Sequence, residues 1–250
     1  MKKLPLLLLF FVLSSAGIIT SGLKAQDLDN LRIGFQLSPT MSWMRTNNTK
    51  ITSQGSTFGF KIGIAGEYFF SKKEYYSLTA GLNLAMGQGG RLLYGYAGNF
   101  LPNSSLSEST LHALPIDSDI KYKLQYIEIP IGLKMRTNEI GYLRYFAELP
   151  IFTLGFLTQG RGDITTVSTI AESENIKPDI APINLYWGVG GGAEYNLTSN
   201  TSLIAGLYFQ QSILDITRNK NATKVVDGSN VKEDSKATGN SIVLRLGFAF

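Results

Sequence analysis

The stretch GNSIVLRLGFAF, from Gly239 to Phe250, decides how the rest of the sequence is interpreted. Successive side chains of a β-strand point to opposite faces, so every second residue shares a side. One side is small or polar with Arg245 at its middle. The other is wholly apolar, and consists of Ile242, Leu244, Leu246, Phe248 and Phe250. A strand with one side in lipid and the other facing a lumen has this pattern. The stretch therefore predicts a transmembrane β-barrel.

Seven segments upstream alternate in the same way, at residues 31–43, 57–70, 75–90, 120–136, 141–157, 183–196 and 202–216. Their connections alternate between long and short. The long ones are 44–56, 91–119, 159–182 and 217–238, and the short ones are 71–74, 137–140 and 197–200. This asymmetry is typical of bacterial outer-membrane barrels. We expect an all-β fold, an eight-stranded antiparallel up-and-down transmembrane β-barrel with short periplasmic turns and four longer extracellular loops.

Charged residues recur on the side opposite the apolar stripe. A charge inside a barrel is costly unless it is paired and hydrogen-bonded, so these residues are expected to form a structural network in the lumen. They are Arg32, Lys61, Glu67, Glu128, Lys134, Arg136, Arg144, Glu148, Glu194 and Arg245. The interior of an eight-stranded barrel is just filled by side chains. A plugged scaffold is therefore favoured over a small-solute porin, which stays the main alternative.

Local expectations follow from the same alternation. Pro39 is expected to mark a bulge or the end of regular pairing, because proline cannot donate a ladder hydrogen bond. Gly87 is expected to face inward and Ile151 outward. Aromatic girdles are expected near the strand ends. Their members would be Trp43, Tyr68, Phe70, Tyr75, Tyr76, Tyr195, Phe248 and Phe250.

A lipocalin-like soluble barrel also alternates, with its apolar side inside around a ligand. The polar side distinguishes the two folds, since here it is rich in glycine as well as charge. The exterior of a lipocalin is rarely rich in glycine, whereas the narrow lumen of a small membrane barrel needs small residues. The pattern favours the membrane barrel.

The first residues, MKKLPLLLLFFVLSSAGIITSGLKAQ, have the layout of a secretory signal: two lysines, an apolar run and small residues before Ala25. We expect residues 1–25 to be a cleaved signal peptide and 26–250 to form an outer-membrane β-barrel. Three of the 23 basic residues lie in that signal, and the others nearly balance the 19 acidic ones. The basic net charge thus gives no indication of nucleic-acid binding. The chain has no cysteine, which excludes disulfides and thiolate metal sites.

Candidates for catalysis are sparse. The single histidine, His112, has serines and aspartates nearby in sequence, namely Ser104, Ser105, Ser107, Asp117 and Asp119. A nucleophile needs a base within hydrogen-bond reach, and no tight motif surrounds these residues. GVGGGAE at Gly188–Glu194 lacks the following helix of a dinucleotide site. We expect no enzyme, no cofactor and no metal, although a lipid-modifying enzyme remains a rival class.

The segment QYIEIPIGLKMR carries the pattern Tyr-x-Glu-Ile-Pro-x-x-x-Lys, at Tyr126, Glu128, Ile129, Pro130 and Lys134. With the final Phe250 and the Ala25–Gln26 junction, it resembles the PorT-like outer-membrane β-barrel family of Bacteroidota. The resemblance implies an outer-membrane location and an eight-stranded barrel. The best-known members of that family take part in type IX protein secretion. It fixes no functional residues.

The expected role is a non-enzymatic structural or accessory subunit of an outer-membrane assembly. Expected partners are outer-membrane lipid and lipopolysaccharide, the barrel-insertion machinery, and other outer-membrane or secretion proteins. Phe250 is expected to be the assembly signal that the insertion machinery reads.

Overall fold

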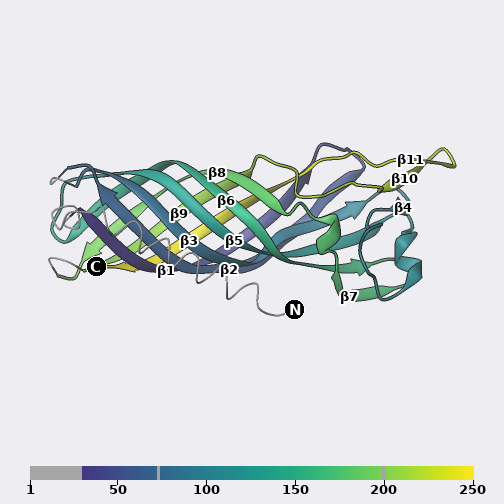
Figure 1. Cartoon of the computed structure of the whole chain (residues 1–250), viewed down its shortest axis with the longest axis horizontal. Coiled ribbons are helices and arrows are strands. Elements are labelled where there is room, and N and C mark those ends of the chain that lie inside the picture. The colour runs from purple at the N-terminus through teal and green to yellow at the C-terminus, as the bar shows by residue number, and fades with distance from the viewer. Residues whose placement is uncertain (1–29, 72–73, 199–200) are drawn as a thin grey trace, which may run out of the picture.

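The structure, a computed structural model, describes residues 30–71, 74–198 and 201–250; the expected signal peptide lies outside them. Within these ranges eight long antiparallel strands form the wall of a closed barrel (Figure 1). They are β1 (Leu31–Thr46), β2 (Ile51–Phe69), β3 (Tyr76–Tyr94), β5 (Ser118–Arg136), β6 (Leu143–Thr165), β8 (Ile183–Asn196), β9 (Ser202–Ser212) and β12 (Ala237–Ala249). The predicted fold class is confirmed. No helix in the described ranges is long and apolar enough to cross a membrane.

The barrel closes where β12, which contains most of the stretch Gly239–Phe250, pairs with β1. β12 pairs with β1 from Gly34↔Ala249 to Thr46↔Ala237, and β5 pairs with both β3 and β6, so the ring has no free edge. The connections between β2 and β3, β5 and β6, and β8 and β9 lie with the C-terminus at one end, called the turn end (Figure 1). The remaining connections lie at the other, called the loop end.

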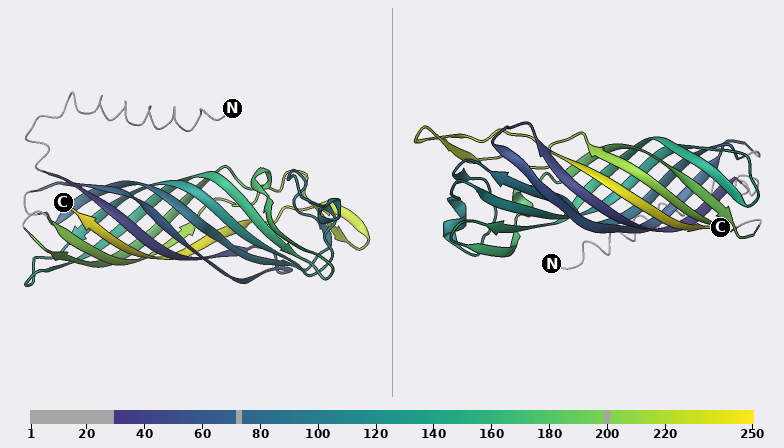
Figure 2. Two further views of the ribbon diagram at one scale, coloured as in Figure 1. Left: turned by 90° about the horizontal axis from the view of Figure 1, so that it is seen from below. Right: turned by 180° about the vertical axis from the view of Figure 1, so that it is seen from behind.

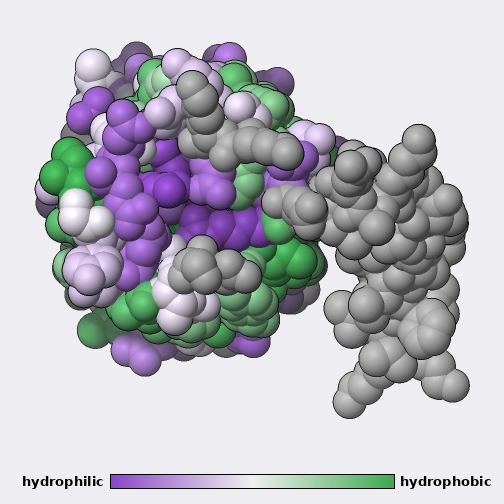
Figure 3. Space-filling model, turned by 90° about the vertical axis from the view of Figure 1, so that its left-hand side faces the viewer, coloured by the Kyte–Doolittle hydropathy of each residue, from purple (hydrophilic) through white to green (hydrophobic). Residues whose placement is uncertain are grey.

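In the half nearer the turn end, the wall is apolar outside and polar inside. Along β1, for example, Phe35 and Leu37 are about half exposed, whereas Gln36 and Ser38 are buried inside. Figure 3 looks into the turn end and shows hydrophilic residues lining its hollow. The outward apolar residues of all eight strands form what we call the apolar belt.

Strand β5 shows that both faces exchange their polarity toward the loop end. Its outward residues are apolar from Ile127 to Met135, and polar from Asp119 to Gln125. Its inward residues change at the same level, from Glu128–Arg136 to a buried apolar set between Ile120 and Tyr126. The nine-residue apolar segment matches the roughly 9–11 residues with which a strand crosses a bilayer. Above it the barrel has the polarity of a water-soluble protein.

The connections at the loop end fold over this upper half. They contain β4 (Gly98–Asn99), a 3₁₀ helix η1 (Ser109–His112), β7 (Ile170–Asn175), a 3₁₀ helix η2 (Lys177–Asp179), β10 (Thr223–Val226) and β11 (Ser229–Lys232). The β10–β11 hairpin extends beyond the barrel and pairs with β4 (Figure 2). Burial lowers the pKa of Lys224 in β10, but the carboxylates of Glu233 and Asp234 outweigh it and raise the pKa overall.

Apolar side chains of these connections pack inside the upper barrel, and we call this core the plug. Phe100, Leu101, Leu111 and Leu114 come from the segment between β3 and β5, and Ile176, Ile180 and Ile216 come from the later connections. They meet the inward wall residues Met44, Ile51, Leu92, Ile120, Tyr122, Leu124 and Ile164. Inside the plug the hydroxyls of Tyr94 and Tyr122 lie 2.6 Å apart in a hydrogen bond.

The predicted loops are therefore too long. Residues 44–46 and 51–56 belong to β1 and β2, leaving only 47–50 as a turn. The large loop predicted for 91–119 shrinks to 95–117, and 159–165 continue β6. Polar outward residues are compatible with a strand wherever its exterior meets water, so polarity alone did not mark the ends.

Pro39 causes no bulge and does not end the strand, but the ladder of β1 with β12 skips Ser38 and Pro39 and resumes in the same register at Thr40↔Val243. The pairing of β1 with β2 runs without a shift from Ser38↔Lys61 through Pro39↔Phe60 to Thr40↔Gly59. Pro39 points outward with the apolar residues of its strand. The proline therefore interrupts the ladder on one side of the strand without changing the register.

The expected directions of Ile151 (outward) and Gly87 (inward) are wrong, because both residues lie at β-bulges. The register of β6 shifts between Glu148 and Ile151, so Leu149 and Pro150 both lie on the exposed side and Ile151 becomes fully buried. The register of β3 shifts between Ala85 and Gln88, where Gly87 adopts φ +70°. A bulge inserts a residue and reverses the alternation beyond it.

Aromatic rings collect at both borders of the apolar belt. At the turn end Phe250 lies 6.0 Å from Phe35 and 6.1 Å from Phe248, between ring centroids. Toward the loop end Phe209 lies between Trp43 and Trp187, at 6.5 Å and 6.3 Å. Such borders suit rings that prefer the boundary between lipid and water.

Candidate functional site

The lower lumen brings nine of the ten predicted charged residues together, in three groups stacked along the barrel. The strand alternation explains this placement, because each charged residue is an even number of positions away from other inward-facing residues of its strand. Together the nine comprise five cations and four carboxylates.

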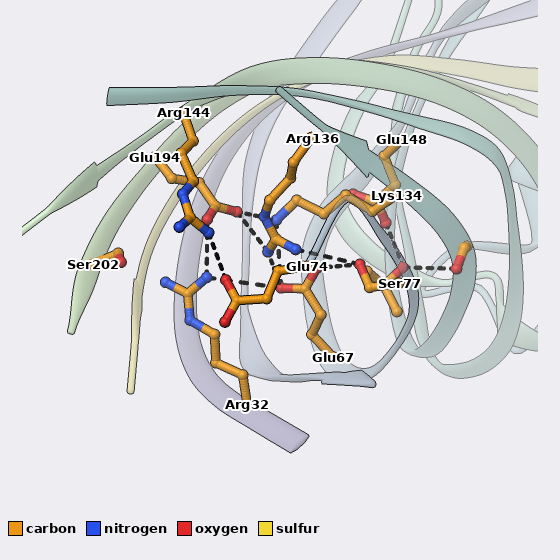
Figure 4. Close-up of polar contacts among 12 residues, drawn as sticks. Arg32, Glu67, Glu74, Ser77, Lys134, Arg136, Arg144, Glu148, Glu194 and Ser202 are labelled. Carbon is orange, nitrogen blue, oxygen red and sulfur yellow. Dashed lines mark hydrogen bonds and ion pairs between the residues drawn. The ribbon is translucent and has the colours of Figure 1, made fainter. Parts of the chain in front are cut away.

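The group nearest the turn end surrounds Glu194 of β8 (Figure 4). Arg32 donates to Glu194 over 2.9 Å, Arg136 does so over 2.9 Å, and Lys134 pairs with the same carboxylate. Glu67 pairs with Arg136 and accepts a hydrogen bond from the Ser77 hydroxyl. The Glu194 and Arg136 side chains are each 1% exposed. The two carboxylates, on β8 and β2, thus link five strands: β1, β2, β3, β5 and β8.

The second group joins β6, β9 and β12. Arg245 Nη1 donates to Glu148 over 2.8 Å and to the Tyr208 hydroxyl over 2.9 Å, while Tyr208 itself donates to Glu148 over 2.9 Å. The guanidinium also lies 3.8 Å from the Tyr208 ring centroid. Thr79 of β3 donates to the second Glu148 oxygen over 2.7 Å. Every oxygen of this carboxylate therefore has a partner.

The third group lies just below the plug. Lys61 donates to Glu128 over 2.7 Å and to the Gln210 amide oxygen over 2.8 Å, which joins β2, β5 and β9. All three side chains are buried. Beyond them a small cavity of about 20 Å³ is lined by Tyr126 and others, which is room for a single water.

Arg144, the tenth residue, lies at the mouth of the lumen. It donates to Glu74 over 2.5 Å and lies 3.5 Å from Glu139, both near the turns. Its side chain is about a quarter exposed. It therefore stands apart from the three buried groups.

Glycines in β8 and β9 make room for the second group. A side chain added at Gly190 would reach within 2.0 Å of the Tyr208 ring, and one at Gly206 within 2.9 Å. The GVGGGAE segment thus allows close packing in the wall. It lies within a strand, in agreement with the argument against a dinucleotide site.

The predicted catalytic candidates are held apart by other contacts. Ser104 donates to Asp179 over 2.5 Å, Ser107 pairs with Glu174, and Asp119 accepts from Arg91 over 2.7 Å. In the described part of the chain no hydrogen bond links His112 to a serine or a carboxylate. The described residues also contain no group of three or more His, Asp or Glu that could hold a metal ion. The serine contacts instead attach the 95–117 connection to β7 and η2.

Sequence reasoning missed the plug, and it placed the neutral members of the network on the inward side without assigning their contacts. A signal for the plug was present in KYKLQY, residues 121–126. Here the even-numbered residues are apolar or aromatic and the odd-numbered ones polar, whereas from Ile127 onward the odd-numbered residues are apolar. The neutral members share the parity of the charges. They are Ser77, Thr79, Tyr208 and Gln210.

Phe250 lies at the closing pair of strands. Its backbone N–H donates to the Ile33 carbonyl over 2.9 Å, and its carbonyl accepts from the Ile33 N–H over 3.1 Å. Its ring is half exposed at the border of the apolar belt.

We expect deletion of Phe250 to reduce the amount of folded barrel in the membrane, because it removes both hydrogen bonds and a border ring. The measurement is the folded fraction in isolated membranes, from heat-dependent gel mobility. Phe250→Tyr retains the backbone pair and an aromatic ring, and should assemble normally. Normal membrane levels of the deletion variant would contradict its role in assembly.

The sequence profile described as Outer membrane protein beta-barrel domain matches residues 24–218. No curated protein matches the sequence.

Among solved structures, Neisserial surface protein A is 14% identical, with a TM-score of 0.42 over 88% of this chain and 96% of its own. Ail, the attachment invasion locus protein of Yersinia pestis, is 12% identical, with a TM-score of 0.38 over 88% and 98%. The outer membrane protease OmpT of Escherichia coli is 9% identical, with a TM-score of 0.39 over 89% and 96%.

Proposed function

The chain belongs to the outer membrane protein β-barrel domain family, and from this we propose that it is a non-enzymatic, non-conducting structural or accessory subunit of an outer-membrane assembly. The protein resides in the outer membrane, which it crosses with its eight strands. The turn end is periplasmic and the loop end extracellular, as in barrels of this type.

The observation that carries the proposal is the filled interior. Paired charges occupy the lumen within the membrane, and the plug occupies the barrel above it. Cavities of about 20 Å³ are found among the third group and within the plug. A buried lumen in which each of the nine charged side chains has an oppositely charged partner supports a scaffold more than a solute path.

The connections at the loop end support a role in assembly. They are ordered by buried carboxylates: Asp179 accepts from the Asn103 amide over 2.7 Å and from Ser104 over 2.5 Å. A folded surface of this kind suits contact with another protein better than a set of loose loops does. A link to type IX secretion belongs to the same proposal, and rests only on the resemblance of the Tyr126–Lys134 strand to PorT-like proteins.

The test of the proposal is co-purification. Gentle detergent extraction of the tagged protein from native membranes, followed by mass spectrometry, should recover a constant set of outer-membrane proteins. A variant lacking the β10–β11 hairpin, residues 223–232, has an unaltered barrel wall and should lose part of that set. Recovery of the protein alone under several mild detergents would contradict an accessory role.

We also predict that the purified protein gives no steady conductance in planar bilayers, because plug and charge network both block the axis. A variant lacking residues 97–114 loses Phe100, Leu101, Leu111 and Leu114 of the plug but keeps the charge network, so it should also show no steady conductance. Stable openings of nanosiemens size from the unaltered protein would contradict the scaffold and favour the porin alternative.

A further inference from the structure

A groove of about 640 Å³ runs along the outside of the wall, over β2, β3, β5 and β6. It lies where the outward residues change from apolar to polar. Phe58 and Met86 line its membrane side, and Gln125 and Gln159 mark the boundary on β5 and β6. The Phe58 side chain is 79% exposed, far more than its apolar neighbours in the same strand. The groove therefore lies at the surface of the outer leaflet.

Three cations line the opposite, extracellular side of this groove: Lys121, Lys123 and Arg161. Lys121 and Lys123 are two residues apart, so both point outward from β5, and Arg161 of β6 is paired directly across from Lys123. Arg161 donates to the Ser173 carbonyl over 2.9 Å, which leaves other guanidinium donors free. Lys121 forms no ion pair anywhere in the described part of the chain.

Nearby carboxylates neutralise only part of this charge. Asp163 pairs with Lys123 and lies directly across from Lys121 in the β5–β6 pair, and Asp119 is held by Arg91 over 2.7 Å. Four cations thus face two carboxylates on this part of the wall. An excess of positive charge directly above an apolar surface matches a molecule with an anionic head and an apolar tail.

We propose that this groove binds a phosphate-bearing lipid of the outer leaflet. The phosphate contacts Lys121, Lys123 and Arg161, and an acyl chain lies along Phe58 and Met86. A phosphate fits better than a carboxylate because its several acceptor oxygens can serve two ammonium groups and a guanidinium fork at once. The site depends on the outer-membrane location and not on the accessory role proposed above.

The test uses the purified full chain in detergent, with bisphosphorylated lipid A and its dephosphorylated form as probes, and native mass spectrometry as the readout. The triple variant K121Q/K123Q/R161Q should bind the phosphorylated probe about tenfold more weakly or worse than the unaltered protein, since each basic residue near an anionic surface contributes to binding. The matched control K220Q/K232Q/K236Q removes as many charges from exposed positions remote from the groove and should bind normally.

Two further arms separate the parts of the ligand. Phe58→Ser should weaken binding several-fold, and a large excess of inorganic phosphate should leave the lipid bound. Equal binding by the triple variant, or equal binding of the dephosphorylated probe, would overturn the proposal. Full displacement by inorganic phosphate would assign the cations to free phosphate and overturn the lipid site. All variants change exposed or partly exposed side chains, and heat-dependent gel mobility verifies that each is folded.

Discussion

Replacing Glu194 by glutamine is expected to lower the free energy of unfolding by about 3–5 kcal/mol, because a buried charge that loses its partner is strongly destabilising. Glu194 accepts from Arg32 and Arg136 and pairs with Lys134, so the substitution leaves three cations around Glu67 alone. The measurement is a urea titration in lipid vesicles, followed by the fluorescence of the two tryptophans, Trp43 and Trp187.

Two further variants distinguish lost charge pairing from general damage. Glu139→Gln alters an exposed ion pair with Arg144 and should change the unfolding free energy by about 0.5 kcal/mol or less. Adding Lys134→Met to Glu194→Gln removes one unpaired cation and should restore part of the loss. A loss below about 1 kcal/mol in Glu194→Gln would mean that water or neighbouring groups already compensate the cations.

Ile131→Arg is expected to lower the free energy of unfolding by about 2–4 kcal/mol, the cost of an arginine on the lipid side at the bilayer midplane. Ile131 is half exposed and lies at the centre of the apolar segment Ile127–Met135 of β5. The same titration in vesicles measures the effect.

Gln125→Arg is the matched control, since it places the same side chain on the same face of β5, six residues nearer the loop end. At the boundary of the bilayer an arginine costs about 0–1 kcal/mol. Similar losses in the two variants would contradict the boundary between Gln125 and Ile127.

Within the membrane, the sequence was sufficient to predict both faces of most strands. Lipid outside and charge inside impose strict alternation there, so Arg245 and Glu194 could be assigned to the lumen from parity alone. Parity does not give depth, however. Arg144 has the correct parity and is paired directly across from Glu194, yet its side chain extends to the mouth, where it contacts Glu74 and Glu139.

Two physical effects limited the prediction elsewhere. A bulge reverses parity without a clear local signature, as at Ile151 and Gly87. Outside the membrane the exterior meets water and the interior is packed, so the same strand continues with inverted polarity and resembles a polar loop. The plug residues Leu111 and Ile180 come from segments without periodicity, and nothing in the local sequence indicates where they pack.

The central claim is that the barrel is embedded in the membrane up to Ile127 and sealed above it. The accessibility of single cysteines along β5 tests this claim most directly. The chain has no cysteine of its own, so each introduced thiol is the only one. Intact cells are treated with a maleimide on a polymer too large for porins. Lys123→Cys should be labelled, whereas Ile131→Cys in lipid and Pro130→Cys in the lumen should remain unlabelled. Labelling of Pro130→Cys as fast as Lys123→Cys would contradict the sealed barrel.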